Sequence, residues 1–302
     1  MIKTLFIVGY PRSGTKLLLQ ILKTHPSISG PNVEVNLAHK LSSKTSDSEF
    51  KRYFEGTTMV RNIEPSKKQQ LDLFLNKNTI KKFSSIEEFY AQFLGIFKKN
   101  DQPKYIIDKS PRYITHIQHL LKEFPNSKIV HIIRNVKSTA NSHSKVWNKN
   151  VYKVADQWNK SVCSVPKEFE DLSKILVIKY ENLVEFPEKH SEKLSKYLDL
   201  ENKFDIINVD SKEKHGNIKS KGVFNNNGKL VMPKFNEKRI EEIAFPALKR
   251  YSYTIFYAKN HREISKLKKL LFFMKDHINL MIFHIREKGL VRGISYYKRL
   301  LN

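Results

Sequence analysis

The stretch TLFIVGYPRSGTKLLLQIL, residues 4–22, decides the fold of this chain. It begins with an apolar run, turns at Gly9, and continues after Gly14 with Leu and Ile at helical spacing. A strand, a glycine-containing loop and a helix in this order form the layout of a phosphate-binding loop. The usual nucleotide pattern is not met, because Thr15 stands where it has Lys and Lys16 where it has Ser or Thr. The loop therefore predicts an anion site without the hydroxyl that commonly holds Mg²⁺.

The same loop supplies the donors that a phosphate requires. In a strand–loop–helix unit, the backbone N–H groups from Ser13 to Lys16 are expected to point toward one position. The N-terminus of the following helix adds positive potential there. The side chains of Arg12 and Lys16 can add charge-assisted hydrogen bonds. We therefore expect this loop to bind a phosphate or a similar anion.

The rest of the sequence repeats the alternation of strand and helix. Short apolar runs rich in Ile, Val and Tyr recur at residues 105–107, 128–133 and 175–179. Helical patterns occupy residues 114–124, 138–147 and 187–200. Buried strands separated by helices predict a parallel sheet covered on both faces. The expected fold class is α/β, a three-layer P-loop fold with a central parallel sheet flanked by helices and followed by a C-terminal helical extension.

Residues 39–100 interrupt this alternation. Two helix-capping signatures occur here, Ser46 with Glu49 and Ser84 with Glu87. We expect helices inserted after the first strand–helix unit, forming a lid on the acceptor side of the strand ends. The insertion is part of one catalytic-type domain.

The chain changes character after about residue 200. Residues 201–235 are polar and contain glycine, which predicts a long loop of the kind that often covers a site. We expect the α/β domain to extend over residues 1–260 and a basic amphipathic helical extension to cover residues 261–302. Residues 262–302 contain ten Lys or Arg and three acids.

The extension has a helical seam of apolar residues. They recur at spacings of three and four: Ile264, Leu267, Leu271, Met274, Ile278, Met281 and Ile285. We expect this seam to dock on the helix's own domain or on a second subunit. The alternative is a basic helix lying on an anionic membrane.

Composition narrows the class of protein. The single cysteine, Cys163, excludes internal disulfides and suits a reducing compartment. The first strand begins near residue 3 and no apolar run is long enough to span a bilayer, so we expect neither a signal peptide nor a membrane span. These features predict a cytoplasmic protein, with peripheral membrane contact left open. The histidines lack metal-ligand spacing, so no metal is expected. The net charge of +25 predicts salt-sensitive association with an anionic partner.

A second anion site is predicted in KIVHIIRNVKSTANSHSKVW, residues 128–147. A buried-type strand ends at Arg134, and Ser142 follows near the second turn of the next helix. A strand-end Arg and a helical hydroxyl can converge on an anion at the carboxyl edge of the sheet, where ligands of α/β proteins bind.

Together these segments resemble the P-loop sulfotransferases that use 3′-phosphoadenosine 5′-phosphosulfate (PAPS). The motifs GYPRSGTKLL, DKSPRYITHI, IIRNVKSTANS and VIKYENLVEFPE match in order, and the resemblance runs from residue 3 to about 200. It implies that the first loop binds the 5′-phosphosulfate and that sulfuryl transfer needs no magnesium. It also implies that Arg134 and Ser142 bind the 3′-phosphate and that Tyr180 contacts the nucleotide. The product would be adenosine 3′,5′-bisphosphate.

The resemblance also suggests the catalytic groups. Glu34 follows the first helix where glycan and tyrosylprotein sulfotransferases carry a catalytic glutamate. The steroid and phenol sulfotransferases instead use a histidine in a segment that here reads DKSPR, without His. Lys109 in this segment matches a lysine that stabilises charge during transfer. In addition, Arg12 and Lys16 of the loop, with its N–H groups, are expected to stabilise the charge on the bridging and leaving oxygens. If Glu34 is not the base, His116 or Asp108 is the next candidate.

Two other functions compete with this interpretation. A P-loop kinase or NTPase is the first, since Asp108 ends a strand as a magnesium-holding residue would, but Thr15 and Lys16 argue against it. A polyanion- or nucleic-acid-binding protein without catalysis is the second, although no nucleic-acid-binding motif stands out. For the transferase, a carbohydrate hydroxyl is the favoured acceptor. A lipid, a protein tyrosine, a small natural product or an amine stays open.

Overall fold

The protein, analysed as a computed structural model, consists of two compact units. The first contains residues 1–133 and 164–225, and the second contains residues 134–163 and 226–302. The structure describes residues 2–99, 103–171, 173–201, 204–205, 212–213, 216–217, 234–291 and 294–295. Most of the loop expected over 201–235 therefore lies outside the described residues. Two short strands, β6 (Lys212–Glu213) and β7 (Gly216–Asn217), pair antiparallel within it.

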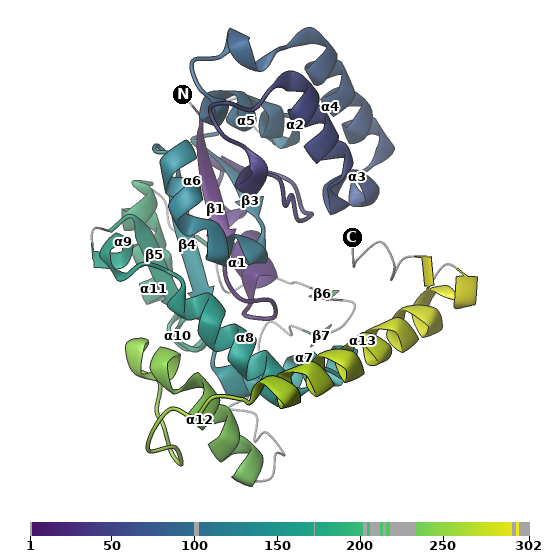
Figure 1. Ribbon diagram of the computed structural model, residues 1–302. Helices are drawn as coiled ribbons and strands as arrows, with labels where there is room; N and C mark the ends of the chain where they lie inside the picture. Colours follow the sequence, from purple (N-terminus) through teal and green to yellow (C-terminus); the bar gives the residue numbers. More distant parts are fainter. Residues whose placement is uncertain are drawn as a thin grey trace. The chain divides into compact units, whose positions relative to one another are not determined.

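The first unit is built on a parallel sheet. The strand order is β2-β3-β1-β4-β5, and every pairing between neighbours is parallel (Figure 1). The strands are β1 (Lys3–Val8), β2 (Ile28–Ser29), β3 (Tyr105–Lys109), β4 (Lys128–Ile133) and β5 (Ile175–Lys179). Helices flank this sheet, so the expected α/β fold is confirmed. The expectation omitted only β2, which at two residues is too short to leave a pattern in the sequence.

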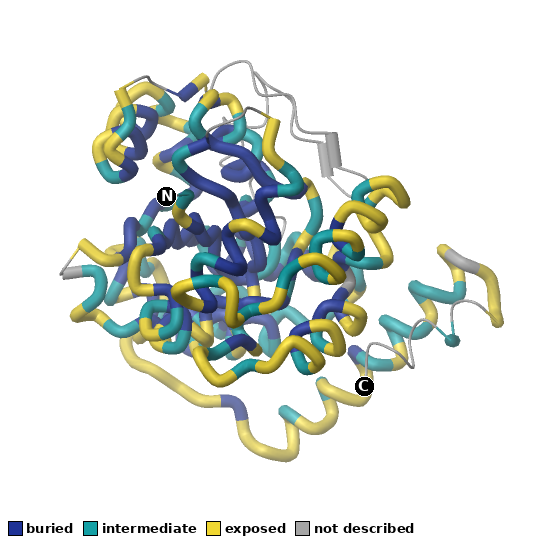
Figure 2. Tube along the Cα trace, turned by 90° about the horizontal axis from the view of Figure 1, so that it is seen from above, coloured by how far each residue is buried: buried dark blue, intermediate teal, exposed yellow. Residues whose placement is uncertain are grey.

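Both faces of the sheet are covered, because successive strand side chains point to opposite sides. On one face, Leu5 and Ile7 of β1 share a buried cluster with α1 (Thr15–Leu22) and α11 (Pro187–Leu198). On the other, the Phe6 ring makes edge contacts with Tyr113 and Phe124, which precede and follow α6 (Ile117–Glu123). Figure 2 shows the resulting band of buried chain. The continuous apolar runs in the sequence follow from this double burial.

The insertion after α1 is helical, as expected. Its α-helices are α2 (Asp47–Glu55), α3 (Thr58–Asn62), α4 (Pro65–Lys77) and α5 (Ile86–Leu94). Ser46 and Glu49 form the predicted capping box at α2. The second signature is wrong by one residue, because Ser85 caps α5 through the Glu88 N–H group. Glu87 is instead buried, and its carboxylate accepts hydrogen bonds from Asn126.

The short remaining elements of the first unit connect these parts. They are the 3₁₀ turns η1 (Ala38–Lys40), η2 (Ile80–Lys82), η3 (Gly95–Phe97) and η4 (Pro111–His116), and the helices α9 (Lys167–Asp171) and α10 (Tyr180–Glu185). The turn η4 begins one residue beyond the end of β3, after Ser110, and α10 begins directly after β5. Both therefore start at the carboxyl edge of the sheet.

The second unit is helical and is held by a buried glutamate. Its helices are α7 (Val136–Trp147), α8 (Val151–Cys163), α12 (Lys234–Arg250) and α13 (Lys266–Lys288). The fully buried Glu241 carboxylate lies 3.1 Å from the Lys137 ammonium. It also accepts hydrogen bonds from the backbone N–H groups of residues 256–258. One carboxylate thus joins α7, α12 and the chain that follows α12.

A proline inside α12 directs the chain toward α13. Pro246 has no N–H group, so the carbonyl of Glu242 loses its acceptor role in the helix. That carbonyl instead accepts from the Arg262 N–H group at 3.0 Å and contacts the His261 ring at 3.0 Å. The next N–H group, that of Ala247, donates to the Asn159 side chain of α8. The break in the helix is therefore compensated by two other parts of the unit.

Most of the expected apolar seam lies outward, contrary to the expectation that it docks on its own domain, and only its first residue, Ile264, is buried. Four side chains of this seam are each more than half exposed: Leu267, Leu271, Met274 and Ile278. Among the residues of this helix whose burial is described, the buried one is the polar Asp276. Periodicity located the helix but did not indicate which face the chain itself would cover.

Replacing Glu241 by Gln is expected to destabilise the second unit. The change removes the charge that compensates Lys137 and leaves a buried ammonium with one carboxylate, that of Glu237. Breaking a buried pair from one side costs about 3 kcal/mol or more. Urea unfolding should therefore show a large decrease in the free energy of unfolding for Glu241→Gln. The decrease should be smaller for Glu237→Gln, because the Glu237 carboxylate is less buried. Equal losses would contradict a central role for Glu241.

Candidate functional site

The loop between β1 and α1 has the conformation of a tight phosphate-binding turn. Arg12 and Gly14 both have positive φ angles, +71° and +98°. Gly14 is also the N-cap of α1, and a Cβ atom there would lie 2.5 Å from the Tyr180 ring. Glycine is therefore required at this position for both its backbone angle and its lack of a side chain.

The donors of this loop fit an anion. Ser13 is fully buried, and its Oγ has no hydrogen-bond partner among the described residues. Its N–H group donates to the Tyr10 carbonyl at 3.1 Å and closes the turn. The first backbone bond of α1 runs from Leu18 to Gly14, so the N–H groups before Leu18 have no acceptor within the helix. A buried hydroxyl and a helix N-terminus thus occupy the same loop, as a phosphate or sulfate would require.

Two of the three predicted catalytic residues, Lys109 and Glu34, form an ion pair. The Lys109 ammonium lies 3.0 Å from a carboxylate oxygen of Glu34. Lys109 ends β3 opposite Ile7 of β1, and the Gly9 N–H group donates to the Pro111 carbonyl at 3.3 Å. The pair is therefore beside the start of the loop. The Lys109 side chain is 8% exposed and that of Glu34 is 45% exposed, so the carboxylate is accessible to a reactant.

Asp108, next to Lys109, is a buried centre of hydrogen bonding. Its Oδ1 accepts from the Ser110 hydroxyl at 2.7 Å. Its Oδ2 accepts from the hydroxyls of Tyr90 and Tyr113 at 2.7 Å and 2.8 Å. Burial raises the pKa of Asp108 to about 6, although the three hydroxyl donors oppose that shift. Both oxygens are engaged within the protein, which argues against the interpretation of Asp108 as a magnesium ligand.

The same hydroxyls hold the segment that carries Glu34. Ser110 Oγ accepts from the Asn36 N–H group at 2.9 Å. The Tyr113 hydroxyl accepts from the N–H groups of Leu37 and Ala38 at 2.7 Å and 2.9 Å. The backbone two to four residues after Glu34 is therefore fixed to the end of β3, where Lys109 lies. This network keeps the segment that follows Glu34 next to the strand end that carries Lys109.

Sequence reasoning missed Ser110, Tyr113 and Tyr90 as supports of the site. The first two lie within DKSPRY, close to Lys109, and their hydroxyls were the available signal. Tyr90 comes from α5 in the insertion. Its contact with Asp108 joins residues 18 positions apart and leaves no periodic pattern.

The remaining predicted residues occupy the positions expected from their motifs. Tyr180 begins α10 and packs its buried ring on Gly14. Arg134 follows the last residue of β4, and Ser142 lies in the second turn of α7. Both are half-buried and belong to the second unit, whereas the loop belongs to the first.

His116, the alternative base, lies in a group of histidines. Its ring centroid is 5.0 Å from that of His39, which also contacts the Tyr113 ring. Burial lowers the pKa of both histidines, that of His39 to about 4. Burial therefore favours the neutral form of each ring. Within the part of the chain that the structure describes, no three His, Cys, Asp or Glu side chains are grouped as a metal site.

Comparison with known proteins identifies the family. The model of the sulfotransferase family matches residues 4–205, which include the loop, the Glu34–Lys109 pair and Tyr180. The chain belongs to the sulfotransferase family. The resemblance seen in the sequence motifs is confirmed.

Individual sulfotransferases are more distant. Protein-tyrosine sulfotransferase 1 of Danio rerio is 25% identical over 210 residues, 65% of this chain and 53% of that protein. The chain thus spans about half the length of this relative. The sulfotransferase domain of the Synechococcus olefin synthase superposes with a TM-score of 0.57 at 21% identity, covering 84% of this chain and 96% of that domain. The sulfotransferase domain from the curacin biosynthetic pathway superposes with a TM-score of 0.56 at 18% identity. The match covers 85% of this chain and 99% of that domain. These two likenesses support the fold.

The raised pKa of Asp108 predicts a specific pH dependence of stability. Since the folded-state pKa is about 6 and the ordinary value is 3.8, the folded protein binds this proton more tightly than the unfolded chain. Stability should therefore fall by roughly 2–3 kcal/mol from this group as the pH rises from about 4 to about 6. Urea unfolding of wild type and Asp108→Asn at pH 4 and pH 7 measures the effect. Parallel pH profiles would contradict it.

Proposed function

We propose that the protein transfers a sulfuryl group from PAPS to a hydroxyl acceptor. The observation that carries the proposal is the Lys109–Glu34 ion pair, 3.0 Å long, at the start of a phosphate-type loop. Family membership supports the reaction class. A labelled-PAPS transfer assay without added Mg²⁺ tests it. Magnesium-dependent turnover of ATP in place of PAPS would instead favour a kinase or NTPase.

The loop residues fit the 5′-phosphosulfate of the donor. The buried Ser13 hydroxyl, the first-turn N–H groups of α1, and the side chains of Arg12 and Lys16 would hold it. The Tyr180 ring, packed on Gly14, would contact the nucleotide. Arg134 and Ser142 would bind the 3′-phosphate. These groups are all hydrogen-bond donors or cations, apart from the tyrosine ring, and so suit a polyanionic nucleotide.

In the proposed reaction the acceptor oxygen attacks sulfur in line with the leaving phosphate. The donor supplies the sulfuryl group when bound. A new O–S bond forms, the S–O bond to the phosphate breaks, and adenosine 3′,5′-bisphosphate leaves. The Glu34 carboxylate takes the acceptor proton. Lys109 and Arg12 stabilise the negative charge that develops on the transferring and leaving oxygens.

The acceptor is narrowed by charge and by the relatives. A net charge of +25 favours an acidic acceptor. The name of the Danio rerio relative supports a tyrosine hydroxyl, whereas no comparison supports the carbohydrate expectation. We therefore place a tyrosine in an acidic peptide first and a carbohydrate second. The single cysteine still favours a cytoplasmic location, which stays a prediction. Transfer of label to acidic tyrosine peptides, but not to their phenylalanine counterparts, is the expected result.

Removing Arg134 should weaken binding of the 3′-phosphate specifically. For Arg134→Ala, calorimetry should show PAPS and adenosine 3′,5′-bisphosphate weakened by roughly 2–4 kcal/mol, since a charge-assisted contact is lost. Adenosine 5′-phosphosulfate lacks the 3′-phosphate, so its affinity should be nearly unchanged. Equal weakening of all three nucleotides would show that Arg134 has another role.

Replacing Glu34 should affect transfer and not donor binding. Glu34→Gln keeps the shape of the side chain but removes proton acceptance, so turnover should fall about 100-fold or more. PAPS affinity should hold or rise, because a negative charge is removed. Lys109→Ala should also lower turnover, although the Glu34 carboxylate is still present in that variant to accept the proton. Near-normal turnover of Glu34→Gln with an active acceptor would exclude it as base and direct attention to His116.

A further inference from the structure

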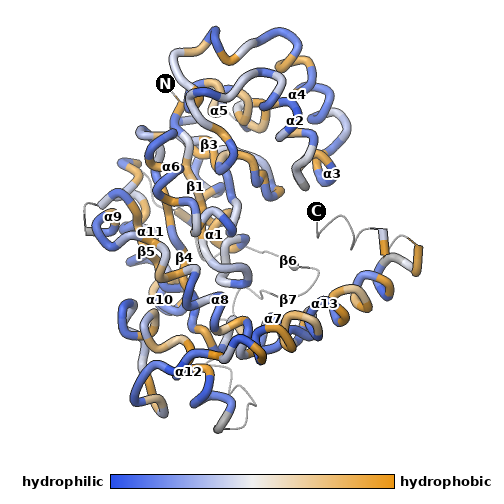
Figure 3. Tube along the Cα trace, viewed as in Figure 1, coloured by the Kyte–Doolittle hydropathy of each residue, from blue (hydrophilic) through white to orange (hydrophobic). Residues whose placement is uncertain are grey.

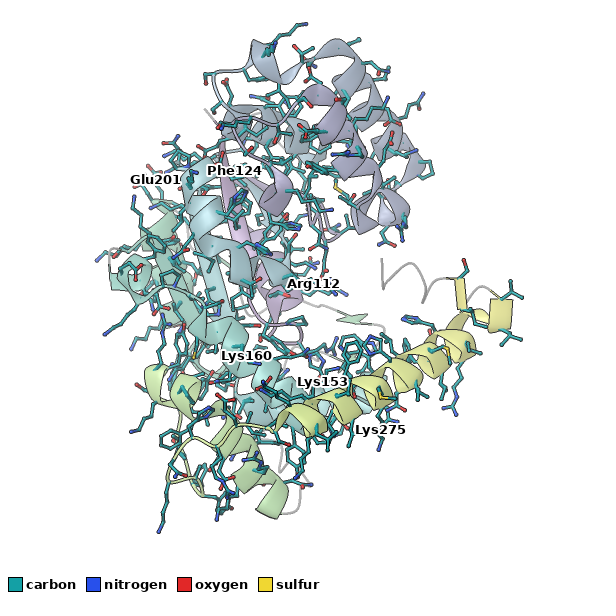
Figure 4. All side chains as sticks on the ribbon, in the orientation of Figure 1. Arg112, Phe124, Lys153, Lys160, Glu201 and Lys275 are labelled. Atoms are coloured by element: carbon teal, nitrogen blue, oxygen red, sulfur yellow. The ribbon has the colours of Figure 1, made fainter. Side chains whose placement is uncertain are left out.

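The helix α13 is attached to its unit by polar side chains. Asp276 is 5% exposed, and its carboxylate lies 3.3 Å from the Lys153 ammonium of α8. It also accepts from the Asn150 N–H group at 2.8 Å. A second ion pair, 3.3 Å long, joins Lys269 to Asp156 of α8. Figure 4 labels Lys153, the α8 residue whose ammonium pairs with Asp276 of α13. The side of α13 that faces the protein is thus largely polar, and it also carries the Phe272 ring, whose centroid lies 6.2 Å from that of Tyr152.

The opposite side of α13 is an exposed apolar stripe. Its residues are Leu267, Leu270, Leu271, Met274, Ile278 and Ile282, with exposed fractions between 39% and 68%. At 100° per residue these six side chains fall within an arc of about 120°. Figure 3 shows the hydrophobic and hydrophilic segments alternating along the helix. Leu290 and Val291, which follow the helix, are also exposed. This orientation is the reverse of that in an ordinary surface helix.

Basic side chains border the stripe on both edges. Lys268, Lys275 and Arg286 are exposed, and helical spacing places them along one edge. Lys266 is exposed at the other edge, near His277 and His284 in the helical projection. Residues 264–291 contain six Lys or Arg against Asp276 and Glu287, and Asp276 is turned inward. The outward face is therefore apolar at its centre and cationic at its margins.

We propose that this face of α13 docks on the surface of an anionic lipid bilayer. The apolar stripe would enter the boundary between headgroups and acyl chains, and the bordering Lys and Arg would meet the headgroup charges. A second copy is a poorer partner, because a symmetric contact would bring these positive margins together. No helix in the described part of the chain is long and apolar enough to cross a membrane. The proposal does not depend on the sulfotransferase activity.

Sedimentation of the full-length protein with vesicles tests this proposal. We expect the protein to pellet with vesicles of 70% phosphatidylcholine and 30% phosphatidylserine and to stay in the supernatant with phosphatidylcholine alone. Binding should weaken as salt is raised. A basic residue near an anionic surface contributes about fivefold in affinity. Lys268→Glu with Lys275→Glu should therefore weaken binding by about 25-fold or more.

Matched variants separate the stripe from general charge. Ile278→Glu places a charge at the centre of the stripe, at a position 54% exposed, and should lower binding at least tenfold without changing the Tm. Leu73→Glu in α4, 49% exposed, makes the same type of change elsewhere and should bind as wild type. The double variant Lys68→Glu with Lys81→Glu makes the same change in charge at two exposed positions outside α13. It should lose much less affinity for the vesicles than the α13 double variant.

Three results would overturn the proposal. They are absence of pelleting with the anionic vesicles, equal pelleting with neutral vesicles, and unchanged pelleting of Ile278→Glu. Light scattering after gel filtration measures the oligomeric state independently. A dimer that Ile278→Glu converts to a monomer, combined with no vesicle binding by wild type, would assign the stripe to a second copy instead.

Discussion

The Asp108 carboxylate needs hydrogen-bond donors because it is buried, and the arrangement of the first unit depends on how they are supplied. Three hydroxyls reach it, from α5, from the end of β3 and from η4. Two of these hydroxyls also accept N–H groups from the segment after Glu34. One buried charge thus fixes the insertion, a sheet strand and the loop of the proposed base in a single network. A buried polar network of this kind is destabilising when one of its hydrogen bonds is missing, so each hydroxyl supports the positions of the others.

The proposed site is divided between rigid and accessible parts. Lys109 belongs to a strand paired on both sides and is nearly buried, so its ammonium has a fixed position. Glu34 lies on a loop with its carboxylate half exposed. A charged group held by the sheet next to a base open to reactants is suited to group transfer, because the acceptor can approach without displacing the scaffold.

Much of this arrangement could be predicted from the sequence. The apolar runs predicted four of the five sheet strands, and the glycine pattern predicted the loop, because these features depend on local burial and backbone angles. The family motifs indicated Glu34, Lys109 and Tyr180 one by one, whereas the ion pair between Glu34 and Lys109 was seen only in the structure. The contact of Tyr90 with Asp108 was not predictable, since side-chain direction across an insertion leaves no periodic signal. Similarly, Ser84 and Ser85 were equally good caps by composition, and only the path of the chain chose between them.

The attachment of α13 has a consequence for cooperativity. The described core of the second unit consists of side chains from α7, α8, α12 and the chain after α12, including Trp158, Ile240 and Ile264. The buried residue that α13 contributes among those described is Asp276, and its contacts with α8 include two ion pairs and the ring contact of Phe272 with Tyr152. Local opening of α13 would therefore expose little core surface and would need only a fraction of the global unfolding free energy. We therefore expect the amide groups of α13 to exchange hydrogen sooner than those of α8 and α12.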